Sequence, residues 1–137
     1  MNIKATHLKK TFGAYPAVND VSLTVAQGEF VTLLGPSGSG KSTVLRLIAG
    51  LETLDAGQIE VNGQDVTDIP VRERQVGFVF QHYALFRHMT LLDNIAFGLK
   101  VRGVNRSDRH AKAAALLELV GLAGYEHRMP HQLSGGQ

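Results

Sequence analysis

The sequence predicts an α/β protein in which a strand-rich first half precedes a helix-rich second half. Short segments of the first half alternate apolar and polar side chains, as half-buried strands do, whereas apolar residues of the second half recur at helical spacing. Within the first half, a glycine-rich loop joins an apolar run of strand length to a helical stretch. The boundary between the two halves falls near residues 81–90.

The first half contains four segments with the pattern of a β-strand. Residues 21–25 alternate apolar and polar side chains, which predicts a half-buried strand. Residues 30–34 form a nearly continuous apolar run, which predicts a strand buried on both faces. Residues 58–61 alternate again and end at Asn62-Gly63, a strong signal for a hairpin. A further apolar run at 76–80 predicts another strand.

The second half contains two predicted helices. Thr90 and Asp93 resemble a capping box with Asp in place of the usual Glu, and they open a helix that runs to about Val101. Ser107 can cap a second helix, which Gly121 ends. Apolar residues lie at helical spacing along this second helix, namely Ala111, Ala114, Ala115, Leu117 and Val120.

Composition excludes several classes of protein. Hydrophobic residues make up 44% and charged residues 19% of the 137 residues, which is typical of a folded globular chain. Lys and Arg exceed Asp and Glu by only two and form no dense run, which argues against a nucleic-acid surface. The absence of Cys excludes disulfides, thiolate metal sites and a cysteine nucleophile. No apolar stretch approaches the ~20 residues of a membrane span and no signal-peptide core is present, so we expect a cytoplasmic chain that reaches a membrane only through a partner.

A phosphate-binding loop is the most specific motif of the first half. Residues 35–43 read GPSGSGKST and match G-x-x-x-x-G-K-[ST] between the apolar run 30–34 and a helical stretch that Gly50 ends. The glycines let the backbone turn its N–H groups toward phosphate oxygens, and the helix dipole adds positive potential. Lys41 supplies a charge to the β- and γ-phosphates, and Ser42 offers a hydroxyl to Mg²⁺. The predicted nucleotide-binding residues are Gly35, Pro36, Ser37, Gly38, Ser39, Gly40, Lys41, Ser42 and Thr43.

Two further motifs carry a family resemblance. The chain ends in LSGGQ at residues 133–137, and Gln81 directly follows the apolar run 76–80. LSGGQ is the signature sequence of ATP-binding-cassette (ABC) ATPases, and that family places its Q-loop glutamine after a core strand. The order of phosphate loop, Q-loop and signature is also the family's, so the chain is identified as a member of the ABC ATPases.

This resemblance implies a P-loop NTPase core with an N-terminal antiparallel β subdomain and a helical subdomain, truncated at the C-terminus. Residues 1–86 are expected to carry the nucleotide-binding core with the β subdomain, and residues 87–137 the helical subdomain that ends at the signature. In the family, the Asp that binds Mg²⁺ and the Glu that polarises water follow the signature, so we expect residues 1–137 alone to hydrolyse ATP only at a background rate. We also expect an unpaired sheet edge that favours aggregation.

Residues 81–90, which read QHYALFRHMT, resemble the Q-loop region of sulfate/thiosulfate import ATP-binding proteins. Related importers of sugars, polyamines or iron share the Tyr-Ala-Leu-aromatic core but commonly carry Pro where Arg87 stands. The resemblance therefore implies an ATP-hydrolysing subunit of a sulfate/thiosulfate importer, at the cytoplasmic face of the inner membrane. The alternatives are an importer of another solute, an exporter subunit, a non-transport ABC protein that acts on nucleic acid or ribosomes, and a non-catalytic nucleotide-binding module.

The family also implies roles for individual residues around the nucleotide. An aromatic residue upstream of the phosphate loop stacks on adenine; Phe12 matches best by its position before Gly13, and Tyr15 is the second candidate. Gln81 is expected to approach Mg²⁺ and the attacking water, since its amide oxygen can ligate a metal or accept from water. The chain's histidines show no metal-ligand spacing, and we expect no histidine metal site.

Partners follow from the same resemblance. The signature acts in trans, so Ser134, Gly135, Gly136 and Gln137 are expected to contact the ATP bound by a second copy, which makes ATP part of the interface of a homodimer. The segment Tyr83–His88 suits a groove that receives a helix of a transmembrane permease subunit, although ordinary packing within the helical half explains it equally well. The family joins two such ATPases to two permease subunits, and an external solute-binding protein delivers the solute.

Overall fold

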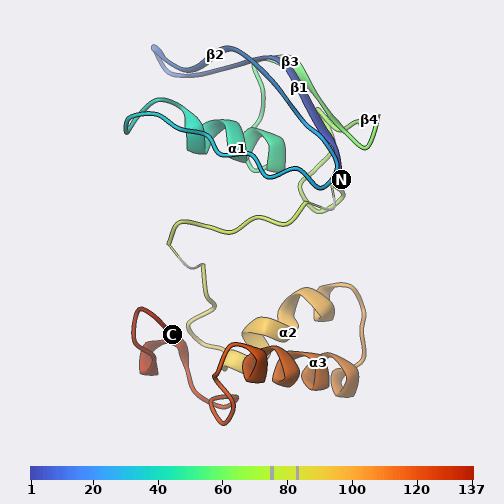
Figure 1. Cartoon of the computed structure of the whole chain (residues 1–137), viewed down its shortest axis with the longest axis vertical. Coiled ribbons are helices and arrows are strands. Elements are labelled where there is room, and N and C mark those ends of the chain that lie inside the picture. Colours follow the sequence, from blue (N-terminus) through green and yellow to red (C-terminus); the bar gives the residue numbers. More distant parts are fainter. Residues whose placement is uncertain (75, 83) are drawn as a thin grey trace. The chain divides into compact units, whose positions relative to one another are not determined.

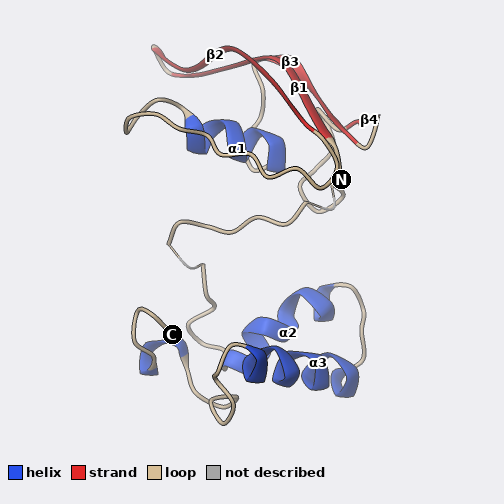
Figure 2. Ribbon diagram, viewed as in Figure 1, coloured by secondary structure: helices blue, strands red, loops and turns tan. Residues whose placement is uncertain are grey.

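A computed structural model describes residues 1–74, 76–82 and 84–137 of the chain (Figure 1). These residues form two compact units, Met1–Phe78 and Val79–Gln137, which are called the β unit and the helical unit below. The β unit combines a sheet with one helix, and the helical unit contains two α-helices and a short 3₁₀ turn (Figure 2).

The sheet of the β unit is antiparallel throughout and has the strand order β2-β1-β3-β4. The strands are β1 (Ile3–Phe12), β2 (Tyr15–Val25), β3 (Ala56–Val61) and β4 (Gln64–Asp65). β3 and β4 meet at a tight turn in which Asn62 has φ 52° and Gly63 has φ 77°, the left-handed values that such hairpins require. The predicted strand at 21–25 and the predicted hairpin at 58–63 are therefore confirmed.

The core of the β unit lies between this sheet and helix α1 (Lys41–Ala49) (Figure 1). Leu47 of α1 is fully buried, together with Leu8 of β1 and Ile59 of β3. The helix ends where predicted, because Gly50 adopts the left-handed conformation with φ 74° that closes a helix C-terminus. The helix that starts at Lys41 is thus anchored through its apolar face, which leaves its first turn available for the phosphate loop.

Arg74 is buried below the C-terminus of α1, a feature that no sequence pattern indicated. Its guanidinium donates hydrogen bonds to the carbonyl oxygens of Leu47 at 2.8 Å and Ile48 at 3.1 Å, and also to those of Thr67 at 2.8 Å and Ile69 at 2.7 Å. Burial lowers the pKa of Arg74, and the nearby carboxylate of Asp68 opposes that shift. The side chain ties residues 67–74 to the end of α1 and supplies the basic group that a helix C-terminus favours.

The helical unit is built on α2 (Leu91–Val101) and α3 (Arg106–Leu119). Thr90 caps α2 as predicted, because its hydroxyl accepts a hydrogen bond from the Asp93 amide at 3.2 Å. The prediction that Ser107 caps the next helix is wrong. The cap is Asn105, whose extended backbone and side-chain oxygen, 3.0 Å from the Asp108 amide, start α3 earlier.

The buried stripe of α3 is narrower than the apolar spacing suggested. Ala113 and Leu117, four residues apart, are each 1% exposed, whereas Val120 lies beyond the helix end and is 65% exposed. Ala111 and Ala115 are also exposed. One face of α3 packs against α2, and a single neighbouring helix covers only such a stripe.

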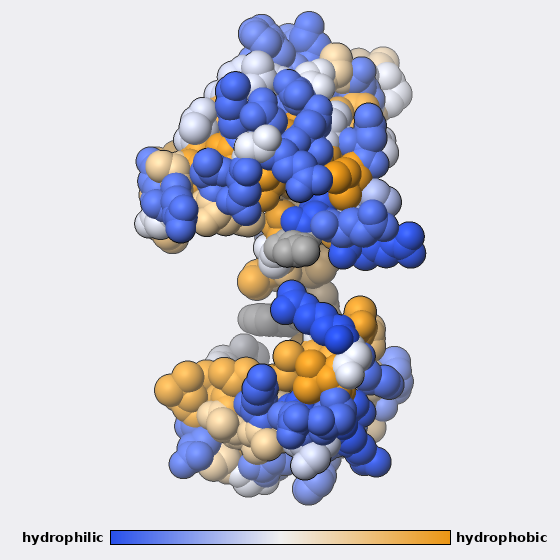
Figure 3. Space-filling model, turned by 90° about the vertical axis from the view of Figure 1, so that its right-hand side faces the viewer, coloured by the Kyte–Doolittle hydropathy of each residue, from blue (hydrophilic) through white to orange (hydrophobic). Residues whose placement is uncertain are grey.

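Two predicted strands are absent. Neither 30–34 nor 76–80 adopts strand structure, and the side chains of Phe30, Leu34 and Val79 are 92%, 88% and 95% exposed. A strand buried on both faces needs hydrogen-bonded neighbours and covering layers on both sides, and the described sheet consists of β1–β4. Apolar side chains accordingly reach the surface of both units (Figure 3).

Candidate functional site

The phosphate loop, residues 35–40, leads directly into the first turn of α1. Gly35, Gly38 and Gly40 have φ angles of 153°, 82° and 86°, a region that L-residues with a Cβ rarely adopt. The first turn of α1 contains no acidic residue, so its N–H groups and the positive end of its dipole are not neutralised locally. The backbone N–H groups at this helix N-terminus are suited to bind an anion.

Lys41 lies at the centre of the loop. Its ammonium donates hydrogen bonds to the carbonyl oxygens of Gly35 at 2.9 Å and Pro36 at 2.6 Å, and to the hydroxyl of Ser39 at 3.1 Å. The loop therefore folds around its own cation and holds that charge beside the N-terminus of α1. Phosphate oxygens are stronger hydrogen-bond acceptors than these neutral groups, so the Lys41 ammonium is suited to bind an anion at this place.

The two aromatic candidates for base stacking face each other across the β1–β2 turn. Phe12 pairs with Tyr15 in the strand register, and their side chains are 46% and 58% exposed. The Lys10 ammonium lies over the Phe12 ring, 5.4 Å from its centre, whereas the Tyr15 hydroxyl donates a hydrogen bond to the Gly38 carbonyl at 3.0 Å. Among the described contacts, the hydrogen bond of Tyr15 is the one that links either aromatic side chain to the phosphate loop.

Lys10 belongs to a charged cluster that sequence reasoning missed. Its ammonium lies 3.3 Å from Asp55 and 3.4 Å from Glu52, and Asp55 also accepts a hydrogen bond from the Thr11 amide at 2.7 Å. That amide is the main cause of the lowered pKa of Asp55. Burial lowers the pKa of Lys10 and both carboxylates raise it, which leaves it above its usual value. The cluster fixes the end of β1 that carries Phe12.

The Q-loop residues lie in the helical unit. Gln81 is exposed, and Tyr83 lies outside the described residues. Phe86 packs its ring on Phe97 of α2, with 4.4 Å between ring centres, and its backbone N–H and carbonyl both bond to Asn94. For Phe86 the structure shows packing within the helical unit, and 39% of the residue stays exposed.

The signature residues form an exposed turn after the 3₁₀ segment Pro130–Gln132. The Gln137 side-chain oxygen accepts hydrogen bonds from the Ser134 amide at 3.0 Å and the Ser134 hydroxyl at 3.1 Å. This turn borders a cavity of about 490 Å³ whose other walls come mainly from α2, α3 and the segments beside them. The signature is thus presented at the surface of the helical unit, with its serine next to two glycines.

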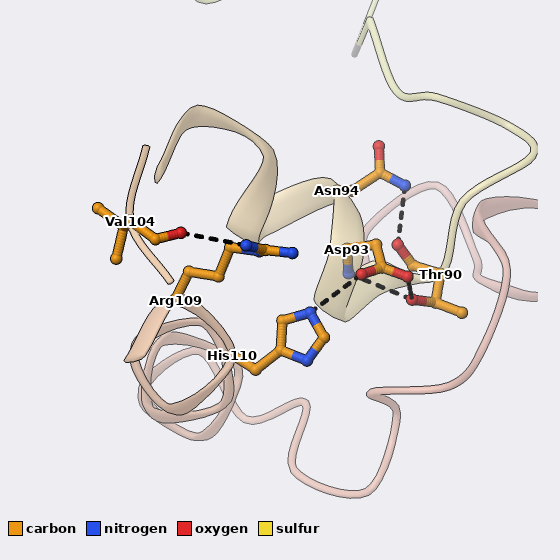
Figure 4. Close-up of polar contacts among 6 residues, drawn as sticks. All are labelled: Thr90, Asp93, Asn94, Val104, Arg109 and His110. Carbon is orange, nitrogen blue, oxygen red and sulfur yellow. Dashed lines mark hydrogen bonds and ion pairs between the residues drawn. The ribbon is translucent and has the colours of Figure 1, made fainter. Parts of the chain in front are cut away.

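A polar network holds α2 and α3 in place (Figure 4). His110 Nε2 of α3 lies 3.1 Å from Asp93 Oδ1 of α2, and the other Asp93 oxygen accepts from the Thr90 hydroxyl at 3.0 Å. Asn94 and Arg109 add bonds to backbone carbonyls. Within the described ranges, no group of three or more His, Cys, Asp or Glu side chains could hold a metal ion.

The chain is similar in sequence and in fold to proteins of one known family. The family model described as "ABC transporter" matches residues 18–137. The chain belongs to the ABC transporter family. Two solved structures of the same ABC cassette, one of them a dimer in a post-hydrolysis state bound to ADP and Pi, align with 98% of this chain at a TM-score of 0.87. They are 31% and 32% identical to this chain, and the alignment covers 64% of their own length. The predicted α/β fold class of an ABC ATPase is therefore confirmed.

Curated relatives of the cassette carry a more specific name. The sulfate/thiosulfate import ATP-binding protein CysA of Thermosynechococcus vestitus is 58% identical over 137 residues, covering 100% of this chain and 41% of the relative. CysA 2 of Rhizobium meliloti is 55% identical over 141 residues, covering 100% of this chain and 38% of the relative. The cassette chain thus spans about two fifths of the length of these relatives. In the part of the chain that the structure describes, every helix is too short or too polar to cross a bilayer.

Proposed function

We propose that this chain is the nucleotide-binding part of an ABC importer ATPase that energises sulfate/thiosulfate uptake. The observation that carries the proposal is the phosphate loop, in which Lys41 lies 2.6–3.1 Å from three loop oxygens beside the start of α1. The names of relatives at 52–58% identity support the solute. An importer of another solute, such as a sugar, a polyamine or iron, is the alternative. The chain spans about two fifths of the length of these relatives, and the residues assigned below account for nucleotide binding.

Binding of the nucleotide is assigned mainly to residues of the β unit. The amides of residues 35–43 and the Lys41 ammonium bind the phosphates, and Phe12 stacks on the base because its exposed ring is held by Lys10. Ser42 is exposed in the first turn of α1, next to Lys41, and its hydroxyl is the kind of hard oxygen donor that Mg²⁺ takes. A bound Mg²⁺ would supply positive charge beside the phosphates, and Gln81 is proposed as a second ligand that also orients water.

Residues of the helical unit are proposed to contact partner molecules. Ser134, Gly135, Gly136 and Gln137 contact the nucleotide of a second copy, which their exposed turn supports. The segment 83–88 receives a helix of a permease subunit. Two ATPase subunits and two permease subunits then form a transporter to which a solute-binding protein delivers solute, with the ATPases peripheral at the cytoplasmic face of the inner membrane. We divide the chain by function into a nucleotide-binding core, residues 1–86, and a helical subdomain, residues 87–137. We expect no nucleic acid among the partners.

Binding of Mg-ATP to the Lys41→Ala variant tests the proposal. A charge-assisted hydrogen bond contributes about 1.5–3 kcal/mol, so the dissociation constant measured by calorimetry should rise about 10- to 150-fold. Lys112→Ala, on the exposed face of α3, is the matched control and should bind as the unmodified chain does. No binding by the unmodified chain, or equal binding by the Lys41 and Lys112 variants, would refute nucleotide binding at this loop.

A further inference from the structure

The first residues of β2 contact the phosphate loop at two matched points. The Tyr15 hydroxyl donates a hydrogen bond to the Gly38 carbonyl oxygen at 3.0 Å. Two residues further along, the Ala17 carbonyl oxygen is so close to Gly40 that a Cβ built there would lie 2.3 Å from it. Alternate residues of one strand therefore meet alternate residues of the loop, and both contacted loop residues are glycines in the left-handed region.

The Tyr15 bond acts on a peptide whose orientation matters for anion binding. The Gly38 carbonyl and the Ser39 N–H belong to one planar trans peptide, so they point in opposite directions. Holding the carbonyl against β2 directs the Ser39 N–H to the inside of the 36–39 turn, where it lies 3.3 Å from the Pro36 carbonyl oxygen. It also keeps the Gly38 oxygen, which would repel a phosphate, on the outer side of the loop.

Glycine is the residue for which such a restraint matters most. Gly38 has open space around its Cα, with no atom within 4 Å of a built Cβ, so packing does not fix its conformation. Glycine also loses more conformational freedom on ordering than any other residue. Gly40 is held by its close approach to Ala17, whereas the Tyr15 hydroxyl is the side-chain group that fixes Gly38 among the described contacts.

We propose that Tyr15 is a positioning residue for the phosphate loop: its hydroxyl orders Gly38 in advance of binding, so that the loop recognises the phosphates of a nucleoside triphosphate at a lower entropic cost. This inference rests on the proposed nucleotide binding and extends it. It gives the two aromatic candidates different roles: Phe12 stacks on the base, whereas Tyr15 orders the loop that binds the phosphates. The ring of Tyr15 is needed only to carry its hydroxyl to Gly38.

Comparison of ATP with inorganic tripolyphosphate distinguishes these roles, because tripolyphosphate has no base. In Tyr15→Phe the affinity for both ligands, measured by calorimetry with Mg²⁺ present, should fall by about two- to tenfold, the range expected for one neutral hydrogen bond. The thermal midpoint should stay unchanged, because the bond lies at an exposed site. Tyr125→Phe removes a hydroxyl from the helical unit and is the matched control that should bind both ligands normally.

Other outcomes would overturn the inference. If Tyr15 stacked on the base, Tyr15→Phe would bind ATP unchanged, and Tyr15→Ala would lose affinity for ATP but not for tripolyphosphate. A lowered thermal midpoint with unaltered affinity for both ligands in Tyr15→Phe would indicate a purely structural role. If the unmodified chain bound neither ligand, the proposed nucleotide binding itself would be wrong. The measurement on the unmodified chain therefore tests nucleotide binding separately from the role of Tyr15.

Discussion

The ammonium of Lys10 lies 5.4 Å from the centre of the Phe12 ring. The same ammonium is held by Asp55 at 3.3 Å and by Glu52 at 3.4 Å. A cation over an aromatic face is attracted by the ring's quadrupole, so a side chain fixed by two carboxylates in turn restrains the ring. Phe12 therefore presents a partly exposed ring in a defined position at the end of β1, as a base-stacking residue requires.

Replacement of Phe12 by Ala should lower the affinity for ATP by about 5- to 150-fold, because stacking of a base on an aromatic ring contributes about 1–3 kcal/mol. The affinity for tripolyphosphate should be unchanged, and calorimetry measures both. Phe12→Trp should retain ATP binding. Since the chain contains no Trp, the fluorescence of that variant reports the bound base directly. Equal losses for both ligands in Phe12→Ala would contradict a stacking role.

The features that the sequence predicted well depend on residues close together in the chain. The Thr90 cap, the Asn62-Gly63 turn and the start of α1 at Lys41 each need only a few consecutive residues to be in place. Local backbone preferences and short hydrogen bonds decide such features. For the same reason, the conformation of the phosphate loop could be predicted from its glycines.

The features that the sequence did not predict depend on residues far apart. Lys10 and Asp55 are separated by 45 positions, and nothing in the local pattern of either marks the contact. The run 30–34 has the composition of a buried strand, but composition does not supply the neighbouring strands that bury one. Arg74 appeared as one more charged residue because its carbonyl partners come from α1 and from the segment 67–69.

The lowered pKa of Asp55 makes the stability of the β unit depend on pH. The Thr11 amide is the main cause of that pKa shift; burial opposes it and Lys10 adds to it. A carboxyl with a folded pKa below the unfolded value of about 3.9 contributes stability that is complete above that pH and is lost as the pH falls through the folded pKa. Asp55→Asn should therefore lower the thermal midpoint at pH 7. Between about pH 5 and pH 2, the thermal midpoint of this variant should fall less than that of the unmodified chain. Circular dichroism melts measure both quantities, and a pH profile identical to that of the unmodified chain would contradict the role of Asp55.

Arg74→Met should destabilise the β unit by about 2–4 kcal/mol, because a buried group that donates charged hydrogen bonds to four carbonyls is lost and the two bonds to α1 lie in a buried place. Urea unfolding followed by circular dichroism measures this change. Arg72→Met is the matched control, because that side chain is 82% exposed and its ion pair with Glu73 contributes little. Similar unfolding midpoints for the two variants would show that the Arg74 bonds do not stabilise the fold.

Gly38 and Gly40 offer a matched pair of substitutions in one loop. Both have positive φ angles, 82° and 86°, so Ala at either position carries a left-handed strain of roughly 1–2 kcal/mol. The Cβ of Gly38→Ala would meet open space, whereas that of Gly40→Ala would lie 2.3 Å from the Ala17 carbonyl oxygen, a backbone atom that can move only with β2. Gly38→Ala should therefore fold normally and bind ATP no more than about tenfold more weakly.

Gly40→Ala should lose ATP binding altogether and also unfold at a lower temperature, because relief of the clash displaces either β2 or the N-terminus of α1. The Gly40 carbonyl accepts the first helical bond of α1 from the Val44 amide at 2.9 Å, so a displaced residue 40 disturbs the helix start as well as the loop. Calorimetry and thermal melts of both variants, measured side by side, check the difference. Equal effects in the two would mean that backbone strain alone, and not the approach of Ala17, requires glycine at position 40.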